Sequence, residues 1–314
     1  MERKDSMIDE IVAESKTNNS KKEFNKEEWA KKKTEERNEV YSLIDKTALE
    51  VIKDKDKFKD YLDIQSHFDK YSVANGLLIY AQMPNATQLR EYSEWKSIPN
   101  FKLNGKQVIL EYGGFQEEEK AREEGIKLLR VGEPYTKNDG SKITPFIVYK
   151  MLDISQTNLP PKEKYSKKID DKILLKAFIH DNPVDIKVED VLTSGKCVEW
   201  NSEENLLYIQ RGAEPSQLYQ GISREVVKAE IESDNSVIDD FKSKCASYMI
   251  CKKQGIDVSN YDFNDIPESF KNLSSKEIRK ELGEIKESVE EFNNRVNQFM
   301  ESISKHSKNK DYER

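Results

Sequence analysis

The stretch that decides the fold is YSVANGLLIYAQMPNATQLREYSEW, residues 71–95. Ser72 is placed to cap a helix, because a serine oxygen can accept a hydrogen bond from a free amide of the first turn. The apolar positions that follow share one helical face, and the segment from Gln82 to Thr87 ends the helix with a proline turn. Three further side chains lie beside that face: Asn75, Tyr80 and Gln82. A purely structural helix has little use for them, so this motif helix is a candidate binding surface.

Helical and strand patterns surround the motif helix. Upstream, apolar residues recur at helical spacing from Phe24 to about Lys55, and a second helix is expected from Lys57 to about Asp69. Downstream, strands are expected at 107–112, 125–131 and 143–154, with a turn at 138–140. Helices followed by a small antiparallel sheet predict an α+β class for this region.

The second half of the chain follows a proline- and lysine-rich linker, which we place at 159–168. Beyond it we expect a helix at 169–180, a strand at 184–188, a hairpin of 196–200 and 205–212, and helices at 222–233 and 241–255. The last helix opens with a capping box, Ser274 to Glu277, and its apolar residues alternate four and three apart over 278–303. This stripe must pack either within the chain, for example on the N-terminal helix, or against a second copy or a protein partner.

Composition limits the possible functions. The chain of 314 residues is long enough for two ordinary domains, 35% of its residues are charged, and its formal net charge is -7. No run approaches the roughly eighteen apolar residues of a membrane span, and residues 1–22, which we interpret as a disordered tail, lack a signal-peptide pattern. The three cysteines form no CxxC pair, which is typical of a cytoplasmic protein. The acidic charge argues against a general nucleic-acid coat protein, so any DNA binding must be local.

Together with Asp153-Ile154-Ser155-Gln156-Thr157, the 71–95 segment resembles the N-terminal domain of the ArdC-type antirestriction proteins of conjugative and other mobile elements. The resemblance is clearest over residues 60–158 and continues more weakly to about residue 285. It implies that residues 23–158 form a single-stranded DNA-binding domain. It also implies that residues 169–273 form a zincin-like metallopeptidase domain, followed by a heptad-patterned helix and tail at 274–314.

If the family's activity carries over, the resemblance implies a strand-binding surface lined by Asn75, Tyr80, Gln82, Thr87 and Trp95, with phosphate contacts from Lys96, Lys102, Lys106 and Arg130. Tyr80 and Trp95 would stack on bases, while Asn75 and Gln82 would donate hydrogen bonds. Core packing is the alternative for Trp95, and bonding to a buried backbone group is the alternative for Asn75. The acidic segment QEEEKAREEG at 116–125 replaces the family's short basic turn, and its charge opposes phosphate.

The metal site of a zincin requires HExxH on a helix, which places two histidines one turn apart. The matching segment here is Arg224-Glu225-Val226-Val227-Lys228, and the third ligand position aligns with Lys244. Guanidinium and ammonium groups offer no lone pair to a metal, so we expect no zinc, no cofactor and no peptidase activity. The three histidines, His67, His180 and His306, are not spaced as a helical ligand pair.

The sequence therefore predicts an α+β protein. It comprises N-terminal helices with a small antiparallel sheet, a zincin-like α+β domain lacking HExxH, and a long amphipathic C-terminal helix. The expected function is that of a single-stranded DNA-binding accessory protein of a mobile element, with antirestriction as the implied role and a degenerate peptidase domain. One alternative is a scaffold whose final helix recruits a partner. The other, an active zinc peptidase, is disfavoured by the ligand chemistry.

Overall fold

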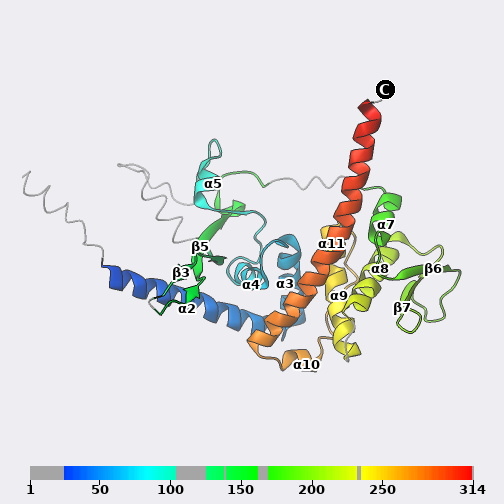
Figure 1. The fold of residues 1–314 in the computed structure, drawn as a ribbon, viewed down its shortest axis with the longest axis horizontal. Coiled ribbons are helices and arrows are strands. Elements are labelled where there is room, and N and C mark those ends of the chain that lie inside the picture. The colour runs from blue at the N-terminus through cyan, green and yellow to red at the C-terminus, as the bar shows by residue number, and fades with distance from the viewer. Residues whose placement is uncertain (1–24, 104–124, 138, 162–168, 232–234, 313–314) are drawn as a thin grey trace, which may run out of the picture. The chain divides into compact units, whose positions relative to one another are not determined.

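The computed structural model describes residues 25–103, 125–137, 139–161, 169–231 and 235–312 (Figure 1). The chain divides into two compact units, residues 1–39 and residues 40–314. The first unit is described from residue 25 and contains the start of helix α2. The second unit combines helices with small sheets, so the predicted α+β class is confirmed.

Three helices open the described chain: α2 (Lys26–Val51), α3 (Lys55–His67) and α4 (Val73–Gln82). Helix α2 ends at Val51 rather than near Lys55, because Asp54 caps α3 by accepting hydrogen bonds from two amides of its first turn. Helix α4 is the predicted motif helix, and its cap is Ser72, which accepts from the amide of Asn75 at 3.3 Å. Helices α3 and α4 pack closely, since a Cβ at Gly76 would collide with the Gln65 side chain.

The first sheet has the strand order β1-β5-β2, and both of its pairings are antiparallel. Its strands are β1 (Leu89–Arg90), β2 (Ile126–Val131) and β5 (Phe146–Asp153). Strands β3 (Tyr135–Thr136) and β4 (Lys142–Ile143) pair with each other within the same hairpin. A short helix, α5 (Tyr92–Lys96), and the turn η1 (Ile154–Gln156) flank the sheet. The strands expected at 125–131 and 143–154 are thus confirmed, whereas the strand expected at 107–112 lies outside the described residues.

The second half contains α7 (Asp171–Ile179), a mixed sheet and two long helices. The sheet has the order β6-β8-β7, with β6 (Asp185–Glu189) parallel to β8 (Leu206–Gln210) and β7 (Val198–Asn201) antiparallel to it. Helices α8 (Pro215–Glu230) and α9 (Ser236–Lys253) start earlier than predicted. Pro215 suits a first helical turn, where no amide partner is needed, and Asn235 caps α9 through the amide of Ile238.

The short helix α10 (Glu268–Lys271) leads into α11 (Ser275–Tyr312), which begins with the predicted reciprocal bonds between Ser274 and Glu277. The apolar stripe of α11 is buried at Ile278, Leu282, Ile285, Val289, Phe292 and Val296. It packs against α9, α7, α8 and α4 (Figure 1). The stripe therefore packs within the chain as far as Val296, and self-association through 278–303 stays a prediction.

One hydrophobic core runs through the second unit. Phe58 of α3 stacks on Phe241 of α9, with 5.6 Å between the ring centroids, so the regions predicted as 23–158 and 169–273 share buried surface. The boundary at 159–168 stays a prediction, and residues 162–168 are not described. A smaller cluster gathers around Trp95, Leu152 and Ile154.

Among the helices that the structure describes, none is both long and apolar enough to cross a bilayer.

Candidate functional site

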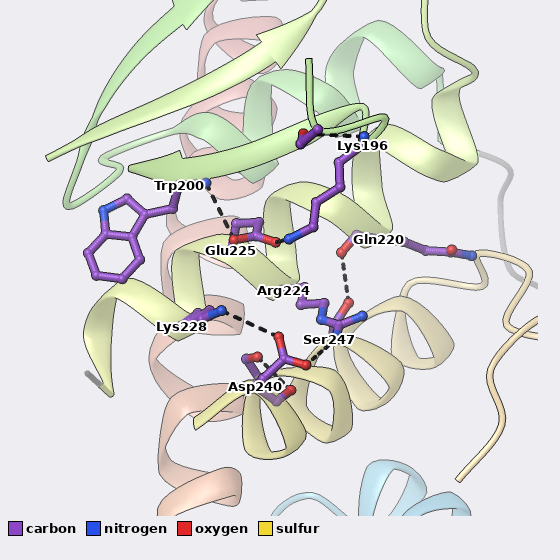
Figure 2. Close-up of polar contacts among 10 residues, drawn as sticks. Lys196, Trp200, Gln220, Arg224, Glu225, Lys228, Asp240 and Ser247 are labelled. Carbon is purple, nitrogen blue, oxygen red and sulfur yellow. Dashed lines mark hydrogen bonds and ion pairs between the residues drawn. The ribbon is translucent and has the colours of Figure 1, made fainter. Parts of the chain in front are cut away.

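Helices α8 and α9 and the segment that enters β7 line a pocket of about 730 Å³. Arg224 and Glu225 reach it from α8, Lys244 from α9, and Lys196 from the residues before β7. The structure thus brings three of the four positions that the sequence aligns with a zincin metal site, Arg224, Glu225 and Lys244, to one pocket. Lys228, one turn further along α8, is not part of the pocket lining. It bonds Asp240, the same carboxylate that Arg224 bonds (Figure 2).

Each cation at a position that the sequence aligns with a zincin ligand is paired with a carboxylate. Arg224 Nη2 donates to Asp240 Oδ2 at 2.7 Å, and Lys228 Nζ donates to Asp240 Oδ1 at 3.4 Å (Figure 2). Lys244 Nζ donates to Asp265 Oδ1 at 2.8 Å. Burial raises the pKa of Asp240, but the charges of Arg224 and Lys228 outweigh that effect and hold the pKa below its usual value. A further carboxylate, Asp262, has its Oδ1 3.8 Å from Lys244 Nζ, so three carboxylates offset the three positive charges.

Glu225, which the sequence aligns with the HExxH glutamate, is buried between α8 and β7. Its Oε1 accepts from Lys196 Nζ at 3.2 Å, and its Oε2 accepts from the backbone amide of Trp200 at 3.4 Å (Figure 2). A buried carboxylate is tolerated only when it is paired and hydrogen-bonded, and both conditions are met here. These contacts make Glu225 a salt-bridged residue that joins α8 to β7. Gly221 permits the close approach, because a Cβ there would lie 2.7 Å from Val198 Cγ2.

The residues at this site do not fit a zinc ion. Its three ligand positions carry one guanidinium and two ammonium groups, which have no lone pair to donate. Within the described residues, no three His, Cys, Asp or Glu side chains are grouped so that they could hold a metal. His180 packs beside Phe299, His67 donates to the carbonyl oxygen of Thr87 at 2.5 Å, and the side chain of His306 lies outside the described part.

The motif helix uses its polar residues to bond the edge of β2. Asn75 Nδ2 donates to the Leu129 carbonyl and Oδ1 accepts from the Leu129 amide, both at 2.8 Å. Gln82 repeats the arrangement with Lys127, with both bonds at 2.9 Å. Two carboxamides thus replace a neighbouring strand at the outer edge of the sheet. The alternative that Asn75 bonds a buried backbone group agrees with these contacts, which leave neither amide directed at a ligand.

Thr87 and Trp95 are held by β5 and the turn that follows it. The amides of Thr87 and Gln88 each donate to Asp153 Oδ2 at 2.7 Å, and Asp153 is fully buried. Trp95 is 1% exposed, and its Nε1 donates to the Leu152 carbonyl at 2.9 Å. A ring with no exposed face cannot stack on a base, so the position of Trp95 fits the alternative of core packing. Asp153, which belongs to the segment Asp153-Ile154-Ser155-Gln156-Thr157, thus fixes the backbone at Thr87 and Gln88.

The remaining residues expected to bind DNA have varied surroundings. Tyr80 of α4 is half-buried against Tyr61, and burial together with the charges of Asp60, Asp54 and Glu50 raises its pKa. Among the cations, Lys96 and Lys102 are exposed, Arg130 pairs with Glu91 at 2.8 Å, and Lys106 lies outside the described residues. The expected acidic cover at 116–125 also lies outside them, except for Gly125.

Comparison with protein-family models and with curated proteins finds no match. Solved structures similar to this chain include two crystal structures of the antirestriction protein ArdC from the R388 plasmid. The metal-free structure shares 13% identity, with 73% of this chain and 86% of that chain covered and a TM-score of 0.49. The Mn(II)-bound structure shares 11% identity, with coverages of 72% and 85% and a TM-score of 0.46. The similarity is to the family that the sequence resembles.

Proposed function

We propose that this protein is a non-catalytic, single-stranded DNA-binding accessory protein of a mobile element, with a role in antirestriction and an inactive peptidase-like site at α8 and α9. The observation that carries the inactive site is the pairing of Arg224 and Lys228 with Asp240 and of Lys244 with Asp265. A dication would have to enter among three fixed cations without gaining a ligand from any of them.

The retained glutamate supports the same conclusion. In a zincin the equivalent carboxylate activates a water molecule bound to the metal. Glu225 instead uses one oxygen for Lys196 and the other for the Trp200 amide, which ties β7 to α8. Its retention is therefore explained by a structural role.

DNA binding is supported by the sequence resemblance over residues 60–158 and by a local reversal of charge. Residues 126–150 contain five Lys or Arg and two Asp or Glu, within a chain whose net charge is -7. A local basic excess is what binding to phosphate requires when the whole protein is acidic.

Metal analysis tests the inactive site. We expect wild-type protein, purified without chelator and incubated with zinc, to retain far less than one zinc per chain by mass spectrometry of the metal. The triple variant Arg224→His, Lys228→His, Lys244→Glu restores a ligand set and serves as the matched control, expected to gain zinc. One zinc per wild-type chain, together with peptide cleavage abolished by Glu225→Gln, would overturn the proposal.

Titration of a fluorescein-labelled oligonucleotide tests the DNA-binding half. We expect saturable binding to single strands, and the logarithm of the binding constant should fall linearly with the logarithm of the salt concentration. The scaffold alternative predicts no binding at any salt concentration and recovery of a protein partner instead.

A further inference from the structure

The hairpin of β2, β3, β4 and β5 exposes large apolar and aromatic side chains to solvent. Tyr135 is 51% exposed and Phe146 is 49% exposed, and Val131 and Ile147 beside them are exposed as well. Val131 pairs with Phe146 on one face, while Ile147, the next residue of β5, points to the opposite face. Both faces of the hairpin are therefore accessible to solvent here. A cluster of large apolar side chains exposed to solvent often marks a binding site.

Cations lie among these rings. Lys137 and Lys142 are exposed and flank the turn, where the Lys137 amide donates to the Ser141 carbonyl at 2.8 Å. Arg130 lies over the ring of Tyr149, with its guanidinium carbon 5.0 Å from the ring centroid. Exposed rings and exposed lysines are thus presented together by one hairpin.

We propose that the surface of this hairpin that carries Val131, Tyr135, Lys137, Lys142 and Phe146 binds single-stranded nucleic acid. Bases stack on Tyr135 and Phe146, and phosphates contact Lys137 and Lys142. This inference rests on the proposed function and assigns it to a surface other than the motif helix.

Charge and chemistry favour a nucleic acid over a protein as the occupant. Aromatic rings interleaved with cations suit a strand in which every base offers a π-face and every linkage a negative charge. A peptide that adds a strand would need a free edge on β2, and the amides of Asn75 and Gln82 already bond that edge at Leu129 and Lys127. The basic excess of residues 126–150 is also complementary to the negative charge of a phosphate backbone.

The test is an anisotropy titration of full-length protein with a fluorescein-labelled oligothymidylate of about 20 nucleotides, a length that exceeds the usual site size. Tyr135→Ala and Phe146→Ala are each expected to weaken binding by roughly 5- to 100-fold, the range that loss of one stacked base produces. Phe146→Trp keeps a ring and should restore affinity. Tyr208→Ala is the matched control, because Tyr208 is an aromatic residue beside Lys187 on a different sheet, β8.

Salt dependence tests the phosphate contacts separately. Lys137→Ala and Lys142→Ala should each reduce the slope of log K against log salt by about 0.7, the value for one contact on a single strand. Lys276→Ala, an exposed lysine at the start of α11, should leave the slope unchanged. Circular dichroism and the melting temperature of each variant confirm that it is folded.

The outcomes separate this inference from the function on which it rests. If the wild type fails to bind any single strand, the proposed function itself is rejected. If it binds, and the hairpin variants bind as tightly as Tyr208→Ala, the protein has a strand site elsewhere and the hairpin assignment is overturned. If sedimentation shows wild-type dimers that Phe146→Ala converts to monomers without weakening DNA binding, the surface joins two copies and the inference fails.

Discussion

Replacing Asn75 with alanine should destabilise the fold rather than remove a DNA contact. Asn75 is 6% exposed, and its amide makes both of its short bonds to the backbone of Leu129, which is itself 8% exposed. In the alanine variant the N–H and C=O of Leu129 lose their partners at a place that water reaches poorly. Each buried group left unpaired costs about 1–3 kcal/mol, so we expect a loss of roughly 2–5 kcal/mol in the free energy of unfolding.

Gln82→Ala is the matched control, since it removes the same pair of bonds from Lys127. Gln82 is only partly buried, so water can replace its amide. Its loss should therefore cost about 0.5–1.5 kcal/mol, the net value of ordinary hydrogen bonds. The difference between the two variants isolates the effect of burial.

Urea unfolding followed by circular dichroism measures both variants, and hydrogen exchange of the Leu129 amide reports the site directly. In Asn75→Ala this amide should exchange faster than in the wild type under native conditions, because its acceptor is gone. The reasoning is refuted if Asn75→Ala unfolds within 0.5 kcal/mol of wild type, on the order of a neutral surface change, yet binds the oligonucleotide more weakly. That result would return Asn75 to the strand-binding surface.

Other contacts lead to further predictions. Gly221→Ala should lower the free energy of unfolding in urea by about 1–3 kcal/mol, because its Cβ would overlap Val198. Gly283→Ala has open space around it in α11 and should raise the free energy of unfolding by up to about 1 kcal/mol. Phe292→Ala should cost about 3–5 kcal/mol by the same assay, since the ring is fully buried in the α11 stripe. For Asp240, whose pKa is lowered in the fold, the carboxylate stabilises above the unfolded pKa of about 3.9, and this contribution is lost as the pH falls through the folded pKa. The stability gap between wild type and Asp240→Asn should therefore be full at pH 7 and vanish once the pH is below the folded pKa, and a gap independent of pH would contradict the pairing with Arg224.

Elements whose causes are local could be predicted from the sequence. Ser72 and the apolar residues after it define α4, and the capping box with its heptad stripe defines α11, because caps and periodicity act within a few residues. The start of α8 was missed because its first turns, from Pro215 to Gly221, are largely polar and give no apolar period. The ion-pair partners of the site were missed for a different reason, since Asp265 is distant in sequence from Lys244 and only the tertiary fold joins them.

Asn75 and Gln82 bond the backbone of the edge strand β2, and they show that a sequence can single out a residue without revealing what that residue does. Asn75 and Gln82 are separated by about 10.5 Å of helical rise, whereas the two backbone positions that they bond are about 6.8 Å apart along a strand. The longer glutamine side chain and the angle between helix and strand close this gap. That angle is set by packing of the whole core, so the spacing in the sequence could not reveal the pairing.

At β7, as at β2, a helix side chain bonds the backbone of an edge strand. The donors and acceptors of each side chain explain which other partners it needs. A carboxamide has both a donor and an acceptor, so Asn75 satisfies the N–H and C=O of one strand residue and needs no counter-ion. An ionised carboxylate can only accept, so Glu225 bonds the Trp200 amide with one oxygen and requires the cation of Lys196 for the other. Glu225 aligns with the catalytic glutamate of HExxH, but here its carboxylate accepts a hydrogen bond from the backbone of the edge strand β7. Substituting it with glutamine should preserve the amide bond while releasing Lys196, which a catalytic role would not predict.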